Sequence, residues 1–293
     1  MFPEIPEEIE PEKLSLALEP EAAAIYCQNM TQQELAQYAR ATHPYTSNTY
    51  MVVDIGGGTV DITVHQVSSS PDCHMKVINT PVGNNFGGSS VNNNFLKFLE
   101  TLVGDKDFSK YIGTSDKSTN ASNAAYLNEL VNNIFEKQKK LFAKKEERGS
   151  KISIRLHYSF MEVYKARLIR GIQDLKDSRI KLSGVDLRIE YSKMEEFFKP
   201  VASGILQCIA EAVKDVEEDM KMTYLVGGFG GCPYLYKAVT EHFGNKYTYV
   251  TPAESDFAVV RGAVLFRLNP DIVHTRKADA TYGVRANIPF EES

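Results

Sequence analysis

Several residue patterns that define common protein classes are missing from this chain of 293 residues. Its four cysteines, Cys27, Cys73, Cys208 and Cys232, include no CxxC pair, so the sequence predicts neither a zinc site nor a disulfide framework. The six histidines likewise lack the spacing of metal ligands. We therefore expect reduced thiols and no metal held by sulfur or imidazole.

Strong positive charge and long apolar runs are also missing. The net charge is −5, and no block of Lys or Arg stands without acids nearby, so we expect neither a nucleic-acid nor a membrane partner. The segment 1–13 is acidic and contains proline, unlike a signal peptide, and no apolar run approaches the length of a membrane span. Together with an ordinary 43% hydrophobic content, these features predict a globular, cytoplasmic protein.

The hydrophobic pattern is typical of an α/β protein. It predicts strands at 14–18, 50–55, 60–67, 75–81, 151–157, 185–191 and 222–226. It predicts helices at 21–26, 89–102, 124–147, 192–220 (interrupted by Pro200), 233–243 and 255–268, with a loop at 104–123.

The most informative segment runs from Asp54 to Asp61, where two carboxylates flank a glycine turn between two apolar runs. Glycines tolerate positive φ and lack Cβ, so the backbone N–H groups of such a turn can approach a phosphate closely, and Thr59 adds a hydroxyl. Asp54 and Asp61 can face a hydrated divalent cation. The segment is neither a Walker A loop nor a dinucleotide fingerprint. Taken alone, it is better explained by a glycine-rich hairpin with solvated acids.

Four other parts of the chain also contain residue types found at nucleotide sites, namely Glu-Pro-Glu-Ala-Ala-Ala at 19–24, a glycine turn at 83–88, Glu-Lys-Gln-Lys-Lys at 136–140, and glycine pairs at 227–231 followed by Asp256. Each has a simpler structural explanation. These are an acid at a helix N-terminus, a turn with Ser89 as helix cap, a solvated charged face, and the first turn of an α/β unit.

In order and spacing these segments resemble the nucleotide motifs of the seventy-kilodalton heat-shock proteins, which belong to the actin-like ATPase superfamily. Details at 18–27, 226–233 and 281–284 look like the divergent twelfth subfamily. The resemblance covers Leu14 to about Val284 and implies an α/β, actin-like ATPase (ribonuclease H-like) fold. It implies an incomplete first lobe at 1–80 with the second phosphate loop, a second lobe at 81–270, and a return segment at 271–293.

The resemblance also implies that ATP or ADP binds with Mg²⁺. The matching residues are Glu19, Asp54 and Asp61 for catalysis, with Asp54 and Asp61 holding the metal through water; Gly56, Gly57, Gly58, Thr59, Gly87 and Gly88 for phosphate; and Glu136, Lys139, Lys140, Gly227, Gly228, Phe229 and Asp256 for adenosine. Phe229 stands where a serine is usual, so we expect its ring to stack on the purine. Asp256 is expected to cap the last helix near the nucleotide.

The family's first phosphate loop, an Asp-x-Gly-Thr hairpin, and the lysine after it have no counterpart here, so we expect an N-terminally truncated chain with weak or no hydrolysis. The expected partners are adenine nucleotide and, by resemblance, protein clients or co-chaperones. Two alternatives stay open: a non-catalytic interaction scaffold, and a sugar or acetate kinase of the same superfamily.

Overall fold

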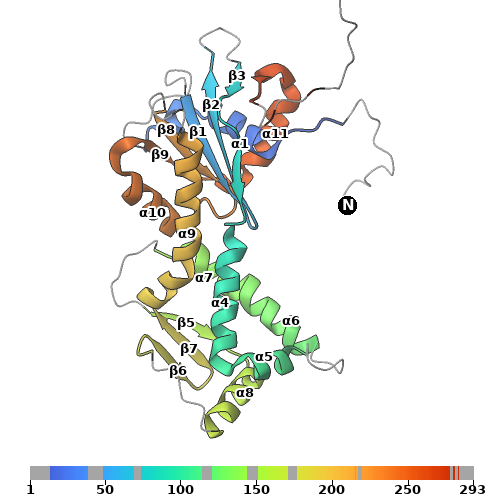
Figure 1. The fold of residues 1–293 in the computed structure, drawn as a ribbon, viewed down its shortest axis with the longest axis vertical. Coiled ribbons are helices and arrows are strands. Elements are labelled where there is room, and N and C mark those ends of the chain that lie inside the picture. The colour runs from blue at the N-terminus through green and yellow to red at the C-terminus, as the bar shows by residue number, and fades with distance from the viewer. Residues whose placement is uncertain are drawn as a thin grey trace, which may run out of the picture.

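The computed structural model describes residues 14–38, 49–68, 74–113, 121–143, 151–170, 177–214, 216, 220–277, 280 and 283. These residues form two connected parts, a large mixed sheet covered by helices and, below it in Figure 1, a group of helices with a small sheet.

The large sheet has the strand order β10-β3-β2-β1-β8-β9, with β4 paired to β2. Its strands are β1 (Thr49–Ile55), β2 (Val60–Val67), β3 (Met75–Val77), β4 (Val82–Asn84), β8 (Met222–Val226), β9 (Thr248–Val250) and β10 (Val273–Thr275). β1 and β2 form the predicted antiparallel hairpin, whereas β1 runs parallel to β8. Every residue of β1 and of β8 is buried, which explains why both strands consist mostly of apolar residues without alternation.

Helices cover both faces of this sheet (Figure 1). α1 (Glu19–Gln28) and α11 (Ala258–Leu268) pack together on one face, and α9 (Tyr191–Val213) and α10 (Pro233–Phe243) lie on the other. The first pair cross closely because Gly262 has no side chain, and a Cβ there would collide with the Ala22 carbonyl. Short elements complete this part: α2 (Gln32–Leu35) and three 3₁₀ turns at Gly244–Lys246, Ser255–Phe257 and Pro270–Ile272.

The second part contains α4 (Gly88–Val103), α5 (Asp105–Ile112), α6 (Ala121–Glu129), a π-helical segment (Leu130–Phe135), α7 (Glu136–Leu141) and α8 (Tyr158–Ile169). β5 (Lys151–Arg155), β7 (Asp186–Glu190) and β6 (Ile180–Ser183) form its antiparallel sheet. The rings of Phe95 and Phe135 stack with centroids 4.1 Å apart and join α4 to the π-helical segment.

Several predicted elements differ from the structure. The strand expected at 14–18 is irregular, because no described strand pairs with it, and Leu14, Leu16 and Leu18 are more than half exposed. The loop expected at 104–123 contains α5, whose Phe108 and Tyr111 are buried one turn apart. α8 and β6 were not predicted.

The expected interruption of the long helix at Pro200 is wrong, because α9 continues through this exposed residue. The helix expected at 124–147 instead contains the π-helical segment and ends at Leu141, and residues 144–147 lie outside the described part. Thr281, Tyr282 and Val284 of the subfamily motif also lie outside it.

The predicted lobe limits place β1 to β3 and β8 to β9 in different lobes. In the structure these strands form one sheet, joined by the parallel pairing of β1 with β8. β1, β2 and β3 therefore pair with one another, and each also pairs with a strand on the other side of the expected boundary, namely β8, β4 and β10.

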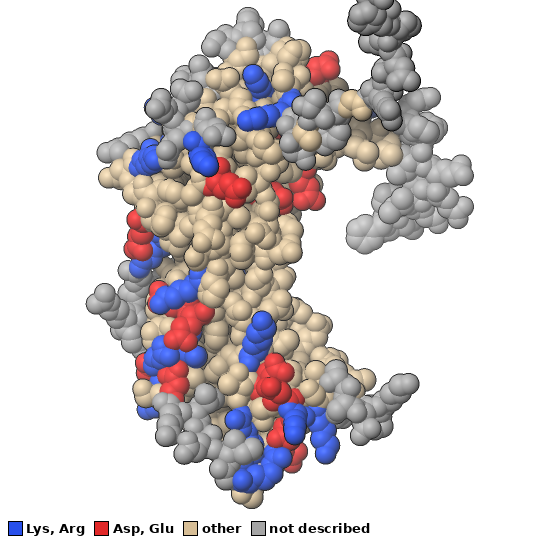
Figure 2. Space-filling model, in the orientation of Figure 1, with Lys and Arg blue, Asp and Glu red and all other residues tan. Residues whose placement is uncertain are grey.

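None of the described helices combines the length and the apolar composition that a membrane span requires. On the face shown in Figure 2, basic and acidic side chains are interspersed, and most of them lie over the lower part of the molecule.

Candidate functional site

Two glycine turns meet at one edge of the large sheet. The parallel register pairs Asp54 of β1 with Val226 of β8, so the turns after these strands leave the sheet together. The N–H of Phe229 donates to the carbonyl of Ile55 at 2.9 Å and fastens the second turn to the first. This is the edge at which open α/β sheets bind their ligands.

A third glycine turn, at the start of α4, packs behind the first. The N–H groups of Gly87, Gly88 and Ser89 donate to the carbonyls of Gly58, Gly56 and Gly57 at 3.1, 3.0 and 2.7 Å. Helices begin with N–H groups that have no partner inside the helix, and the first glycine turn supplies those partners here. Gly87 and Gly88, expected to contact phosphate, therefore use their N–H groups inside the protein.

These hydrogen bonds orient the first turn. The peptide bonds are trans, so the C=O and N–H of each peptide unit point in opposite directions. Because the carbonyls of residues 56, 57 and 58 face α4, the N–H groups of Gly57, Gly58 and Thr59 face away from it. All three residues are exposed, and within the described part of the chain no hydrogen bond engages their N–H groups. Successive outward N–H groups of this kind form an anion-binding nest.

Glycine is present for different reasons in the first turn (residues 56–58) and in the third turn (Gly87). Gly56, Gly57 and Gly58 do not use the positive φ that glycine allows, and an added Cβ at each would meet no atom closer than 3.6 Å. At Gly87 a Cβ would lie 2.5 Å from the Gly57 carbonyl oxygen. The fold thus requires glycine at 87, whereas at 56–58 the fold leaves room for a side chain, as it would at a backbone that a ligand approaches closely.

Carboxylates lie beside the first turn as the sequence predicts. Asp54 and Asp61 are direct cross-strand partners in the hairpin, and the Thr59 hydroxyl donates to Asp61 at 3.0 Å. Asp54 is only 7% exposed, and burial, followed by the charges of Glu19 and Asp61, raises its pKa to about 6. Glu19, the third predicted catalytic acid, is near enough for its charge to contribute to this shift in the pKa of Asp54.

No group of three or more His, Cys, Asp or Glu side chains among the described residues is arranged to hold a metal ion directly. A Mg²⁺ ion usually keeps several waters and is bound by one or two carboxylates. Asp54 and Asp61 therefore fit the predicted water-mediated contact.

Two residues expected at the adenosine contact each other. Lys139 Nζ lies 2.5 Å from Glu136 Oε2 and also donates to the Gly88 carbonyl at 3.0 Å. The shared helix face was predicted correctly, but Lys139 is 2% exposed. Lys140 is exposed.

Phe229 does not offer its ring to a purine. It is 2% exposed, it packs toward Phe198, and its ring lies 4.9 Å from Lys139 Nζ. The expected stacking is wrong because the aromatic side chain fills the core and covers the lysine, a favourable cation–π arrangement.

Of the remaining nucleotide candidates, one is required by the fold and two are exposed. Gly227 has a φ of 87°, and a Cβ there would collide with Asp54, so the fold needs this glycine. Gly228 is exposed, and a Cβ would meet nothing within 4 Å. Asp256 is exposed but does not cap α11, whose N-cap is Phe257 without a side-chain hydrogen bond.

One residue of this region was not predicted. Asn92 of α4 is buried, and its Nδ2 donates to Glu136 Oε2 at 2.9 Å. The only sequence signal is a polar residue on the apolar face of an amphipathic helix.

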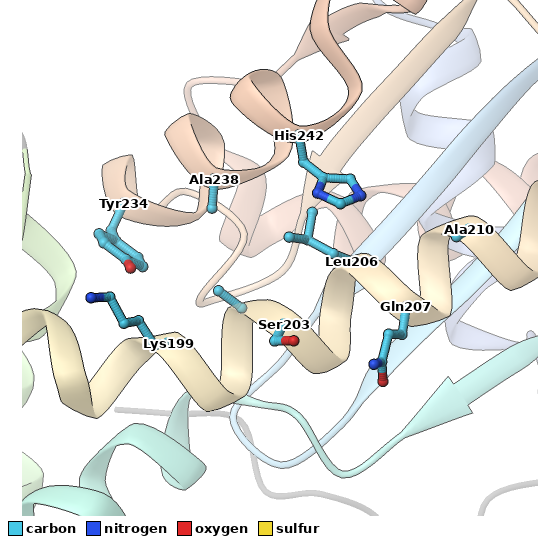
Figure 3. A pocket seen from close by; sticks show the side chains of 9 residues that line it. Lys199, Ser203, Leu206, Gln207, Ala210, Tyr234, Ala238 and His242 are labelled. Atoms are coloured by element: carbon cyan, nitrogen blue, oxygen red, sulfur yellow. The ribbon is translucent and has the colours of Figure 1, made fainter.

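A separate hollow of about 420 Å³ lies between α9 and α10 (Figure 3). Lys199, Ser203, Gln207, Tyr234 and His242 are among the residues that line it. None of the predicted nucleotide residues does, so this hollow is distinct from the glycine-turn site.

The sheet and its edge define an α/β protein with a candidate anion site, and comparison gives the family. Residues 18–267 match the family model described as Hsp70 protein. The chain therefore belongs to the Hsp70 family, which has the actin-like ATPase fold.

Relatives support the predicted subfamily. The chain is 29% identical to Heat shock 70 kDa protein 12A of Mus musculus, over 93% of this chain and 46% of that protein. It is 28% identical to Heat shock 70 kDa protein 12B of Homo sapiens, over 93% and 45%. Chaperone protein DnaK of Thermoplasma volcanium is 23% identical over 78% of this chain and 33% of that protein. The chain thus spans about half the length of the first two relatives.

The contact between the glycine turns can be tested by a matched pair of substitutions. We expect Gly87→Ala to lower the free energy of unfolding by about 1–3 kcal/mol, because its Cβ overpacks against the Gly57 carbonyl. Gly58→Ala should change it by less than about 0.5 kcal/mol, since the new Cβ meets no atom within 4 Å. Urea unfolding measures both, and equal destabilisation would contradict the packing described.

Burial of Asp54 predicts a pH dependence of stability in metal-free buffer. With a folded pKa of about 6, above its ordinary value of 3.8, the carboxyl binds protons more tightly in the folded state. The ionisation of Asp54 therefore does not change the free energy of unfolding below about pH 4. It lowers that free energy progressively between about pH 4 and 6, and by about 3 kcal/mol above that range.

Asp54→Asn should accordingly leave stability unchanged near pH 4 and raise it above pH 6. The exposed Asp271 provides the control, because Asp271→Asn should show no such difference. Parallel stability curves for wild type and Asp54→Asn would refute the burial effect.

Proposed function

We propose that this chain binds ATP or ADP with Mg²⁺ at the edge of the large sheet, as the nucleotide-binding part of an Hsp70-type protein. The observation that carries the proposal is the set of three outward N–H groups of Gly57, Gly58 and Thr59 beside the Asp54–Asp61 pair. Donors for a polyphosphate and oxygen ligands for its metal ion lie on the same hairpin. Family membership supports the same function.

Each group has a distinct proposed role. The three N–H groups bind phosphate oxygens, while Asp54 and Asp61 hold Mg²⁺ through its water ligands. Glu19, which affects the charge state of Asp54, orients water near the metal. Bound Mg²⁺ supplies positive charge that neutralises the phosphates.

The nucleoside is proposed to lie along the exposed backbone at Gly228, near Glu136. Asn92 and Lys139 both bind Oε2 of Glu136, and within the described residues no hydrogen bond engages its Oε1. This second oxygen is available to accept a ribose hydroxyl. Lys140 and Asp256 are retained as exposed candidates for further contacts.

Hydrolysis by this chain is proposed to be slow. Phosphoryl transfer depends on positive charge close to the transferred group. Lys139, the lysine beside the glycine turns, is already engaged by Glu136 and the Gly88 carbonyl. Chaperone activity, with its clients and co-chaperones, and a cytoplasmic location belong to the proposal for the whole protein.

Calorimetric titration with Mg²⁺–ATP tests the proposal. Wild type should bind, and Gly58→Ala should bind roughly ten-fold more weakly, because its Cβ occupies the approach to the N–H groups and costs a hydrogen bond to a charged phosphate. Val260→Ala, on the exposed side of α11, is the control and should bind like wild type.

Two outcomes would contradict the proposal. Absence of binding at millimolar Mg²⁺–ATP would favour the interaction scaffold. Transfer of phosphate to added glucose or acetate would favour the kinase alternative.

A further inference from the structure

Lys139 is a buried cation with every described contact inside the protein. It lies between Glu136 Oε2, the Gly88 carbonyl and the ring of Phe229. Burial lowers the pKa of Lys139, whereas the hydrogen bond and charge of Glu136 raise it. Burying a lysine costs desolvation free energy unless well-placed partners offset it, and Glu136 and the Gly88 carbonyl are such partners here.

The peptide unit between Gly88 and Ser89 is held at both ends. Its C=O accepts from Lys139 Nζ at 3.0 Å, and its N–H donates to the Gly57 carbonyl at 2.7 Å. A cation at the carbonyl polarises the peptide unit and makes its N–H a stronger donor, because hydrogen bonds in a chain reinforce one another.

The next peptide unit continues this chain to the surface. The Gly57 carbonyl that accepts from Ser89 belongs to the same trans peptide unit as the outward N–H of Gly58. A continuous path therefore runs from Lys139 Nζ through two peptide units to the Gly58 N–H.

We propose that Lys139 is a positioning residue that strengthens anion binding at Gly58 through this two-peptide hydrogen-bond chain, without touching the ligand. The ligand is the polyphosphate part of the nucleotide, so the inference rests on the proposed function. It differs from the contact to adenosine that the family resemblance implies for this lysine. Two observations support the indirect role over direct contact: Lys139 is buried, and its Nζ lies 3.0 Å from the Gly88 carbonyl.

The ligand-free protein gives the first test. In ¹H–¹⁵N spectra, Lys139→Met should shift the amide protons of Ser89 and Gly58 upfield, because both donors lose polarisation. Lys137→Met, an exposed change on the same helix, should leave both signals in place. Lys139→Gln keeps an N–H donor without the charge and should give a smaller shift. It also replaces Lys139→Met if thermal unfolding shows that variant to be misfolded.

Binding of three probes gives the second test. Lys139→Met should bind pyrophosphate and Mg²⁺–ATP roughly two- to ten-fold more weakly than wild type, the effect of about one hydrogen bond, and should lose no more affinity for adenosine than it loses for pyrophosphate. Weaker adenosine binding with unchanged pyrophosphate binding would overturn the proposal in favour of direct contact.

The two tests separate this proposal from the proposed function. If wild type bound no nucleotide or pyrophosphate, the proposed function would fail, while the ligand-free spectra would still decide whether the chain from Lys139 reaches Gly58. Unshifted Ser89 and Gly58 signals in a folded Lys139→Met protein would overturn the inference on their own.

Discussion

Three backbone hydrogen bonds between the first glycine turn and the start of α4 set the geometry of this site. They satisfy the unpaired N–H groups of a helix N-terminus with the carbonyls of Gly56, Gly57 and Gly58. Since peptide units are planar and trans, the same bonds turn the N–H groups of residues 57–59 outward. One set of contacts therefore joins the two parts of the fold and prepares a site for an anion.

This constraint separates glycines that the fold needs from glycines that a ligand would need. A Cβ at Gly87 or Gly227 would collide with the first turn or with Asp54. A Cβ at Gly58 or Gly228 would meet no described atom within 4 Å. The sequence shows these glycines as equivalent, and only the packing around each one distinguishes them.

The sequence predicted what depends on local pattern and motif order. The hairpin of β1 and β2, the helix α10 and the position of Asp54 and Asp61 on either side of the glycine turn follow from alternation and from punctuation by glycine and proline. The family also followed from motif order. The burial of Lys139 and Phe229 did not, because it depends on how α7 meets the turn after β8, and that contact joins residues about 90 positions apart.

The direction of the amides at the glycine turns is the centre of this account. Titration of ¹⁵N-labelled protein with Mg²⁺–ATP, followed by ¹H–¹⁵N spectra, measures it most directly. We expect the largest shifts at Gly57, Gly58 and Thr59, with smaller changes at Gly87 and the residues after it. Large shifts at residues 87–89 with none at 57–59 would contradict it.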